Sequence, residues 1–156
     1  MIALNYYWQA KKKATISNIR NITPWLYETP VAPTIAAKLE KKKISYQSLK
    51  SWCLTKKQSS NKRFILFEGA GGIKVPLEKH KTFIDLFEDV SFPVVLIVGS
   101  YLGTISHTLS ALENLNKRNI KTINIVLNEG IKSSKKAFSQ NLELLRSTIN
   151  DKTKIR

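Results

Sequence analysis

Cysteine is almost absent from this chain, and its scarcity limits the kind of protein the chain can be. Cys53 is the only cysteine among 156 residues, so no internal disulfide can form and nothing points to an oxidising compartment. It lies beside Leu49 and Trp52 in an apolar helical stretch, which favours a small buried side chain over a reactive thiol.

Long apolar runs are also lacking. The longest strongly apolar stretch, residues 93–98, is far shorter than the roughly 20 residues that a membrane-spanning helix needs. The N-terminus runs from apolar to basic, which reverses the order of a secretory signal. We therefore expect a soluble, cytoplasmic protein with no membrane partner.

Acidic residues are few. The chain has 11 Asp and Glu against 26 Lys and Arg, a formal net charge of +15 that could attract nucleic acid or phosphorylated ligands. The lysines are scattered, with short clusters at 11–13 and 41–43, and they form no zinc-finger or RNA-recognition signature. A solvated basic surface is favoured over a nucleic-acid partner, and a basic nucleic-acid-binding protein is an alternative that rests on charge alone.

Neither an internal repeat nor a linker rich in Pro, Gly or Ser divides the chain, so we expect a single domain over residues 1–156. Composition and periodicity predict strands at 1–8, 64–67, 94–98 and 122–127, the second and third buried on both faces. They predict a loop up to residue 20 and helices at 35–40, 45–56, 82–89, after Gly103 and from Ser133 or Ser134, with Ser45 as the N-cap of the second. Alternating strands and helices indicate an α/β fold with a mainly parallel sheet flanked by helices.

Helical spacing also predicts which faces pack inward. The helix after Gly103 should bury Ile105, Leu109 and Leu112. The last helix should bury the apolar residues Phe138, Leu142, Leu145 and Ile149.

All six glycines lie after position 68, at the ends of expected strands. Ligands of parallel sheets bind at the carboxyl ends of the strands, so the chemistry is expected around 68–72, 99–107 and 128–130. In the first segment, Glu68 precedes a glycine-rich turn, and its carboxylate suits Mg²⁺. A plain strand-to-loop turn with an exposed acid is an equally good interpretation.

The second segment, residues 99–107, runs from a strand end into a helix. Free N–H groups and the helix dipole make such a start a natural anion site. The alternative is a capped helix start, with Thr104 or Ser106 as the cap and His107 as an ordinary first-turn residue.

Three motifs, taken in order and at their spacing, closely resemble dethiobiotin synthase. They are Glu68-Gly-Ala-Gly-Gly-Ile-Lys-Val-Pro-Leu77, Pro93-Val-Val-Leu-Ile-Val-Gly-Ser-Tyr-Leu-Gly-Thr-Ile-Ser-His-Thr-Leu-Ser110 and Val126-Leu-Asn-Glu129. Thr29-Pro-Val-Ala-Pro-Thr-Ile-Ala-Ala37 also resembles the family's Pro-x-Ser/Ala-Pro-His stretch, with Thr34 in place of the histidine. The resemblance covers residues 29 to about 130.

The resemblance implies a homodimeric P-loop NTPase-like fold that makes dethiobiotin from 7,8-diaminononanoate, CO₂, ATP and Mg²⁺. It implies Mg²⁺ binding at Glu68. It implies contacts to the nucleotide at Gly69, Ala70, Gly71, Gly72 and Asn128. It implies a substrate carboxylate held across the dimer interface by Leu102, Gly103, Thr104, Ile105 and Ser106. Ser106 replaces the family's asparagine, and its shorter side chain reaches less far.

Two lysine motifs of the family have no counterpart in these residues. There is no Gly-Lys dipeptide, and so no Gly-x-x-x-x-x-Gly-Lys-Thr loop to cradle phosphates. Tyr6-Tyr7-Trp8 resembles the residues before the family's Lys-Pro motif, but Gln9-Ala10-Lys11 follows. None of Lys11, Lys12 and Lys13 can be equated with the missing lysine. We expect the fold without its P-loop strand. The alternatives to an active synthase are an inactive remnant or a subunit that needs a P-loop partner.

Overall fold

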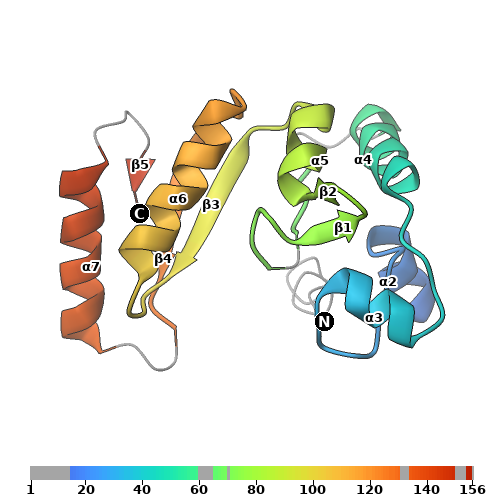
Figure 1. Cartoon of the computed structure of the whole chain (residues 1–156), viewed down its shortest axis with the longest axis horizontal. Coiled ribbons are helices and arrows are strands. Elements are labelled where there is room, and N and C mark those ends of the chain that lie inside the picture. Colours follow the sequence, from blue (N-terminus) through green and yellow to red (C-terminus); the bar gives the residue numbers. More distant parts are fainter. Residues whose placement is uncertain (1–14, 60–64, 70, 131–133, 150–153, 156) are drawn as a thin grey trace. The chain divides into compact units, whose positions relative to one another are not determined.

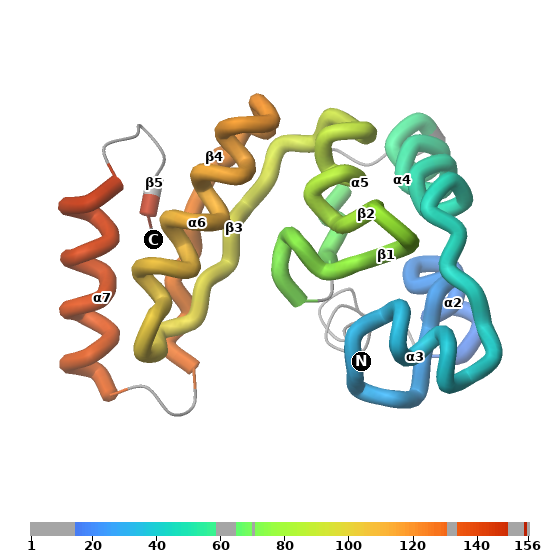
Figure 2. Tube along the Cα trace, viewed as in Figure 1, coloured from blue at the N-terminus to red at the C-terminus, as the bar shows by residue number. Residues whose placement is uncertain are grey.

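The computed structural model describes residues 15–59, 65–69, 71–130, 134–149 and 154–155 (Figures 1 and 2). The chain divides into two compact units, residues 1–86 and 87–156, and each is described by itself. The strand expected at 1–8 lies outside the described residues, and the expectation of one domain stays a prediction. Every helix in the described part is too short or too polar to cross a membrane.

In the described part of the first unit, the first element is helix α2 (Ile16–Ile22), where we expected a loop. Thr15 caps this helix, because its hydroxyl oxygen accepts a hydrogen bond from the N–H of Asn18 at 3.2 Å. The expectation of a loop up to residue 20 was therefore wrong from residue 16 onward. The many basic residues of this stretch favoured a loop, although Thr15 is a capping residue and the apolar residues after it have helical spacing.

Helices α3 (Pro33–Leu39) and α4 (Tyr46–Ser59) confirm two predicted helices. Helix α3 starts two residues earlier than expected because Pro33, with its fixed φ and no N–H group, suits the first turn. Ser45 caps α4 as predicted, accepting from the N–H of Ser48 at 3.2 Å. The N–H of Tyr46 also donates to the Glu78 carboxylate at 2.8 Å, which ties α4 to the hairpin described next.

A small hairpin completes the first unit. Strands β1 (Pro76–Glu78) and β2 (Lys81–Thr82) are antiparallel, and helix α5 (Phe83–Val90) follows and crosses the boundary between the units. The strand expected at 64–67 is wrong in its described part, because residues 65–69 have no regular structure. Ile65 and Leu66 are exposed, and a strand needs a hydrogen-bonded neighbour, which these residues lack within the described chain.

The second unit alternates strand and helix: β3 (Val94–Gly99), α6 (Thr104–Lys117), β4 (Thr122–Asn128), α7 (Lys135–Thr148) and β5 (Lys154–Ile155). The three strands form a parallel sheet in the order β3-β4-β5. The α/β class with a parallel sheet is therefore confirmed. Helix α7 begins at the predicted place, and Ser134 caps it by accepting a hydrogen bond from the N–H of Ala137 at 3.2 Å.

The core of this unit lies on one face of the sheet. Leu96 and Ile125 are register partners, and they pack with Leu112 of α6 and Ile149 at the end of α7. On the opposite face, Val95 is 37% exposed and Ile97 is 60% exposed. The expectation that β3 is buried on both faces was wrong, because both helices pack on the Leu96 face.

Helix α6 buries a face shifted from the predicted one. Its buried residues are Thr104, Thr108, Leu112 and Leu115, whereas Ile105 and Leu109 are half-buried. Two threonines can be buried because both hydroxyls are satisfied: Thr104 donates to the Gly99 carbonyl and Thr108 to the Thr104 carbonyl. In α7 the predicted face is correct, with Leu145 buried and Phe138, Leu142 and Ile149 half-buried.

Adjacent leucines of α7 test how much this packing stabilises the unit. Leu145 is fully buried, whereas Leu144 is 49% exposed. We expect Leu145→Ala to lower the free energy of unfolding by about 2–5 kcal/mol, through lost burial and the cavity left behind. Leu144→Ala, the matched control, should change it by about 0.5 kcal/mol or less. Urea unfolding followed by circular dichroism measures both, and equal losses would contradict the packing.

Candidate functional site

Two of the segments singled out in the sequence meet at the carboxyl end of the parallel sheet. Gly99, the last residue of β3, is the register partner of Asn128, the last residue of β4. The hydrogen bonding between these two segments continues one residue past β3, where the N–H of Ser100 donates to the Asn128 carbonyl at 3.0 Å. Asn128 is exposed, and its side-chain oxygen accepts from the N–H of Gly130 at 3.4 Å. The predicted nucleotide-contacting asparagine and the predicted anion-binding turn therefore share one end of the sheet.

Short hydrogen bonds fix the turn between β3 and α6. The Thr104 hydroxyl donates to the Gly99 carbonyl, and the N–H of Thr104 donates to the Tyr101 carbonyl at 3.1 Å. From α7, the Asn141 amide donates to the Ser100 hydroxyl at 3.0 Å. These contacts anchor a turn whose outermost side chain, Leu102, is fully exposed.

The start of α6 has no side-chain cap. Its N-cap residue is Gly103, with a φ of 97°, and no side chain accepts a hydrogen bond there. The capping interpretation of Thr104 and Ser106 was wrong, because Thr104 is buried and turned toward Gly99 while Ser106 is exposed. The N–H of Thr104 is engaged by the Tyr101 carbonyl, but no side chain caps the start of α6, which leaves the anion-site interpretation open for the N–H groups that follow Thr104.

An aromatic pair beside this turn was not foreseen from the sequence. The Tyr101 hydroxyl lies 2.9 Å from Nδ1 of His107, and the two ring centroids are 5.7 Å apart. Two residues six positions apart across a glycine turn match no sequence motif that would indicate a contact. Only the folded turn brings the two side chains together.

The segment around Glu68 belongs to the first unit. Glu68 is exposed, and Ala70 lies outside the described residues. Gly69 and Gly71 have structural reasons to be glycine. A Cβ on Gly69 would lie 3.2 Å from the Phe83 ring, and Gly71 has a φ of 86° with Val75 only 2.8 Å from its Cβ position. Around Gly72, within the described part of the chain and apart from its two sequence neighbours, no heavy atom lies within 4 Å of the position of a Cβ.

A metal site would have to rest on few protein ligands. Within the described part of the chain, no three His, Cys, Asp or Glu side chains come close enough to hold a metal ion. A lone carboxylate such as Glu68 fits Mg²⁺, which commonly binds one or two carboxylates together with phosphate oxygens and water. Glu68 lies in one unit, and Gly103 and Asn128 lie in the other, so their gathering at one sheet edge stays a prediction.

Cys53 takes no part in such chemistry. It is buried on the inner side of α4, and burial raises the pKa of its thiol to about 11. The thiolate is the nucleophilic form, so this cysteine is inert near neutral pH, as the sequence indicated.

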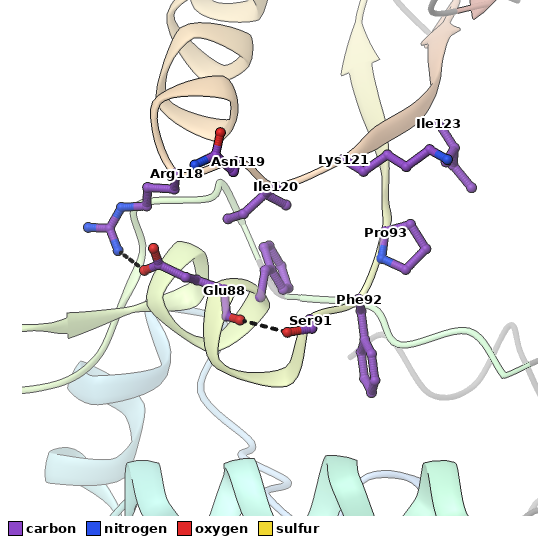
Figure 3. A pocket seen from close by; sticks show the side chains of 10 residues that line it. Glu88, Ser91, Phe92, Pro93, Arg118, Asn119, Ile120, Lys121 and Ile123 are labelled. Carbon is purple, nitrogen blue, oxygen red and sulfur yellow. Dashed lines mark hydrogen bonds and ion pairs between the residues drawn. The ribbon is translucent and has the colours of Figure 1, made fainter.

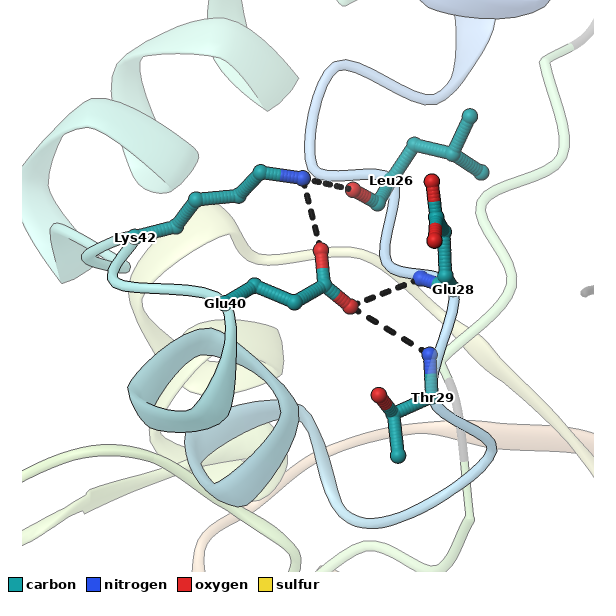
Figure 4. Close-up of polar contacts among 5 residues, drawn as sticks. All are labelled: Leu26, Glu28, Thr29, Glu40 and Lys42. Carbon is teal, nitrogen blue, oxygen red and sulfur yellow. Dashed lines mark hydrogen bonds and ion pairs between the residues drawn. The ribbon is translucent and has the colours of Figure 1, made fainter.

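A polar cluster orders the chain just before the Thr29–Ala37 stretch (Figure 4). The Glu40 carboxylate accepts from the N–H groups of Glu28 and Thr29 at 2.7 and 3.3 Å. Lys42 pairs with Glu40 at 2.7 Å and donates to the Leu26 carbonyl at 3.2 Å. The Lys42 hydrogen bond, followed by the backbone donors, holds the pKa of Glu40 below its usual range.

A pocket of about 400 Å³ lies at the opposite end of the strands in the second unit (Figure 3). Pro93 and Lys121, which directly precede β3 and β4, line it, and an ion pair at 2.8 Å between Arg118 and Glu88 closes one side. The rest of its lining is Phe87, Ser91, Phe92, Asn119, Ile120 and Ile123. None of the residues predicted from the sequence to bind a ligand lies in it.

Comparison with known proteins gives consistent results. The family model of an AAA domain matches residues 9–155. An ATP-dependent dethiobiotin synthetase BioD from Caulobacter vibrioides is 37% identical over 127 residues, which are 81% of this chain and 57% of that protein. The protein of the same name from Brucella anthropi is 36% identical, covering 79% of this chain and 62% of its own length. The one from Phenylobacterium zucineum is 33% identical over 85% of this chain and 56% of its length. The chain thus spans somewhat more than half the length of these relatives.

The Glu40 cluster predicts a pH-dependent stability. Because the folded-state pKa of Glu40 is lowered, its contribution is fully present above the unfolded-state pKa and is lost as pH falls through the folded-state pKa. We expect Glu40→Gln to lower the melting temperature at pH 7 and to flatten its decline below about pH 4.5. The matched control is Glu28→Gln, because only the backbone N–H of that residue takes part in the cluster. Parallel melting curves for wild type and Glu40→Gln across this range would contradict the assignment.

Proposed function

The chain belongs to the dethiobiotin synthetase family, and from that premise we propose that it serves a cytoplasmic ATP- and Mg²⁺-dependent dethiobiotin synthase of biotin biosynthesis, whose phosphoryl transfer needs a phosphate-binding loop that these 156 residues do not contain. In this reaction CO₂ adds to one amine of 7,8-diaminononanoate to form a carbamate. ATP phosphorylates the carbamate, and the second amine then closes the ureido ring with loss of phosphate. The observation that carries the proposal is the joining of the Gly99–Gly103 turn and Asn128 at one end of the parallel sheet.

Each predicted residue would have a distinct role in that reaction. The exposed side chain of Asn128 would recognise the adenine ring, and the Gly69–Gly72 turn would approach the nucleotide. Glu68 would hold Mg²⁺, which offsets the negative charge of the phosphates when bound. The uncapped start of α6, from Leu102 to Ser106, would hold the substrate carboxylate through its N–H groups.

An inactive remnant, or a subunit that needs a P-loop partner, is the alternative. Phosphoryl transfer normally relies on a phosphate-cradling loop and its lysine as well as Mg²⁺. These 156 residues contain no Gly-Lys dipeptide. Within the described chain, β3 pairs on one side only, with β4, so its other edge could accept a further strand. Both features suit a chain whose phosphate-binding strand is supplied separately.

The activity of these 156 residues distinguishes the two hypotheses, a chain that is active by itself and a chain that is inactive or needs a P-loop partner. We expect the purified chain to bind ATP weakly or not at all and to form no detectable dethiobiotin. The reason is that each missing charge-assisted hydrogen bond to phosphate would contribute about 1.5–3 kcal/mol. A chimera that supplies a Gly-x-x-x-x-x-Gly-Lys-Thr strand and loop should regain turnover. In the chimera, Glu68→Gln should abolish turnover, and Glu143→Gln, an exposed acid on α7, should not. Isotope-labelled bicarbonate followed into dethiobiotin measures each variant.

Robust turnover by the unmodified chain, lost in Glu68→Gln, would show that another element replaces the phosphate loop. A chimera that binds ATP but makes no dethiobiotin would count against the proposed reaction itself.

We also expect a homodimer whose interface includes the start of α6. Leu102 is fully exposed and Ile105 is half-buried, and exposed apolar side chains often mark contact surfaces. Light scattering after size-exclusion chromatography should give the mass of a dimer for the wild type and a monomer for Leu102→Asp. Leu144→Asp, on an exposed position of α7, should remain dimeric. A wild type that is monomeric at every concentration would refute this interface.

A further inference from the structure

Tyr101 and His107 flank the start of α6, one before it and one in its first turn. Their side chains meet through the contact of 2.9 Å between Tyr101 Oη and His107 Nδ1, with the ring planes inclined at 45°. Tyr101 is 50% exposed, so burial alone does not hold its ring in place. The hydrogen bond to the imidazole and the contact with Gly99 described next hold it.

Two glycines make room for this pair. A Cβ on Gly99 would lie 3.1 Å from Cδ1 and 3.3 Å from Cε1 of Tyr101, so the phenol ring rests against the end of β3. A Cβ on Gly103 would lie 3.6 Å from Cε1 and 3.9 Å from Nε2 of His107. The Cε1–Nε2 edge of the imidazole therefore lies beside the residue at which α6 begins.

The contact between the Tyr101 hydroxyl and Nδ1 couples the phenol to the protonation of the imidazole, and the direction of the hydrogen bond depends on the tautomer of His107. A neutral imidazole has one N–H donor and one acceptor nitrogen, and the partner of one nitrogen fixes the state of the other. A phenol that donates to Nδ1 leaves the proton on Nε2. The resulting Nε2–H donor belongs to the edge that lies next to Gly103.

We propose that Tyr101 is a positioning residue that holds His107 as the Nε2–H tautomer, and that His107 donates this proton to the carboxylate of the substrate at the start of α6. The inference rests on the proposed function, which assigns the carboxylate to this turn. His107 adds a side-chain donor to a site otherwise built from backbone N–H groups and the exposed Ser106 hydroxyl. It thereby makes the turn selective for a substrate that ends in a carboxylate.

The tautomer is tested first, in the free protein, by ¹⁵N nuclear magnetic resonance of the imidazole nitrogens at a pH where His107 is neutral. The wild type should show a single Nε2–H form for His107, and Tyr101→Phe should show a mixture of both tautomers. His80, the other histidine of the chain, serves as the internal reference and should not change. Identical His107 spectra in the wild type and Tyr101→Phe would overturn the positioning role.

Binding is tested by titrating 7,8-diaminononanoate into the chain while following the amide signals of Gly103, Thr104 and Ser106. We expect His107→Phe, which keeps a ring of similar shape, to weaken binding about 10- to 100-fold, as for loss of a hydrogen bond to a charged group. His107→Gln, whose amide nitrogen reaches about as far as Nε2, should restore part of the affinity. His80→Gln is the matched control. The corresponding diamine without a carboxylate should bind the wild type and His107→Phe equally weakly.

The outcomes separate this inference from the proposed function. If the diaminononanoate shifts these amides and binds His107→Phe as tightly as the wild type, the role of His107 is refuted and the proposed substrate site stands. If the diaminononanoate leaves these amides unchanged, the proposed site at α6 is wrong and the inference fails with it.

Discussion

The parallel pairing of β3 with β4 is the interaction on which the second unit depends. It places Leu96 beside Ile125, which creates the apolar surface that α6 and α7 cover. The same register places Gly99 beside Asn128 and so decides which residues share the functional end of the sheet. A shift by one residue would turn the core residues to the opposite face and take Asn128 out of register with Gly99. Stability and the candidate site therefore rely on one ladder of hydrogen bonds.

The one-sided cover of this sheet follows from its topology. Strand order β3-β4-β5 means that both crossovers move in the same direction, and right-handed crossovers in one direction place their helices on one face. Val95 and Ile97 face the other way and remain exposed. In α/β proteins helices normally cover such a face as well, and the apolar composition of β3 is typical of a strand covered on both faces.

The residues of the candidate site are held by ordinary structural contacts before any ligand binds. Thr104 is used to fasten the turn, and Gly99 and Gly103 leave space for the Tyr101 and His107 rings. Gly69 and Gly71 are likewise required by the Phe83 ring and by a positive φ. A glycine-rich motif can thus serve packing and ligand approach together, and the motif alone does not separate the two roles.

The sequence by itself determined the α/β class, the positions of β3, β4, α4 and α7, the cap at Ser45, and the family. These features depend on local periodicity, on capping side chains and on motifs in fixed order. Tertiary structure decided the remainder. It left residues 65–69 without regular secondary structure and rotated the buried face of α6 toward Thr104 and Thr108. It also brought Tyr101 to His107. Each of these outcomes depends on contacts that form only in the folded chain. Composition and local spacing do not specify which residues come into contact.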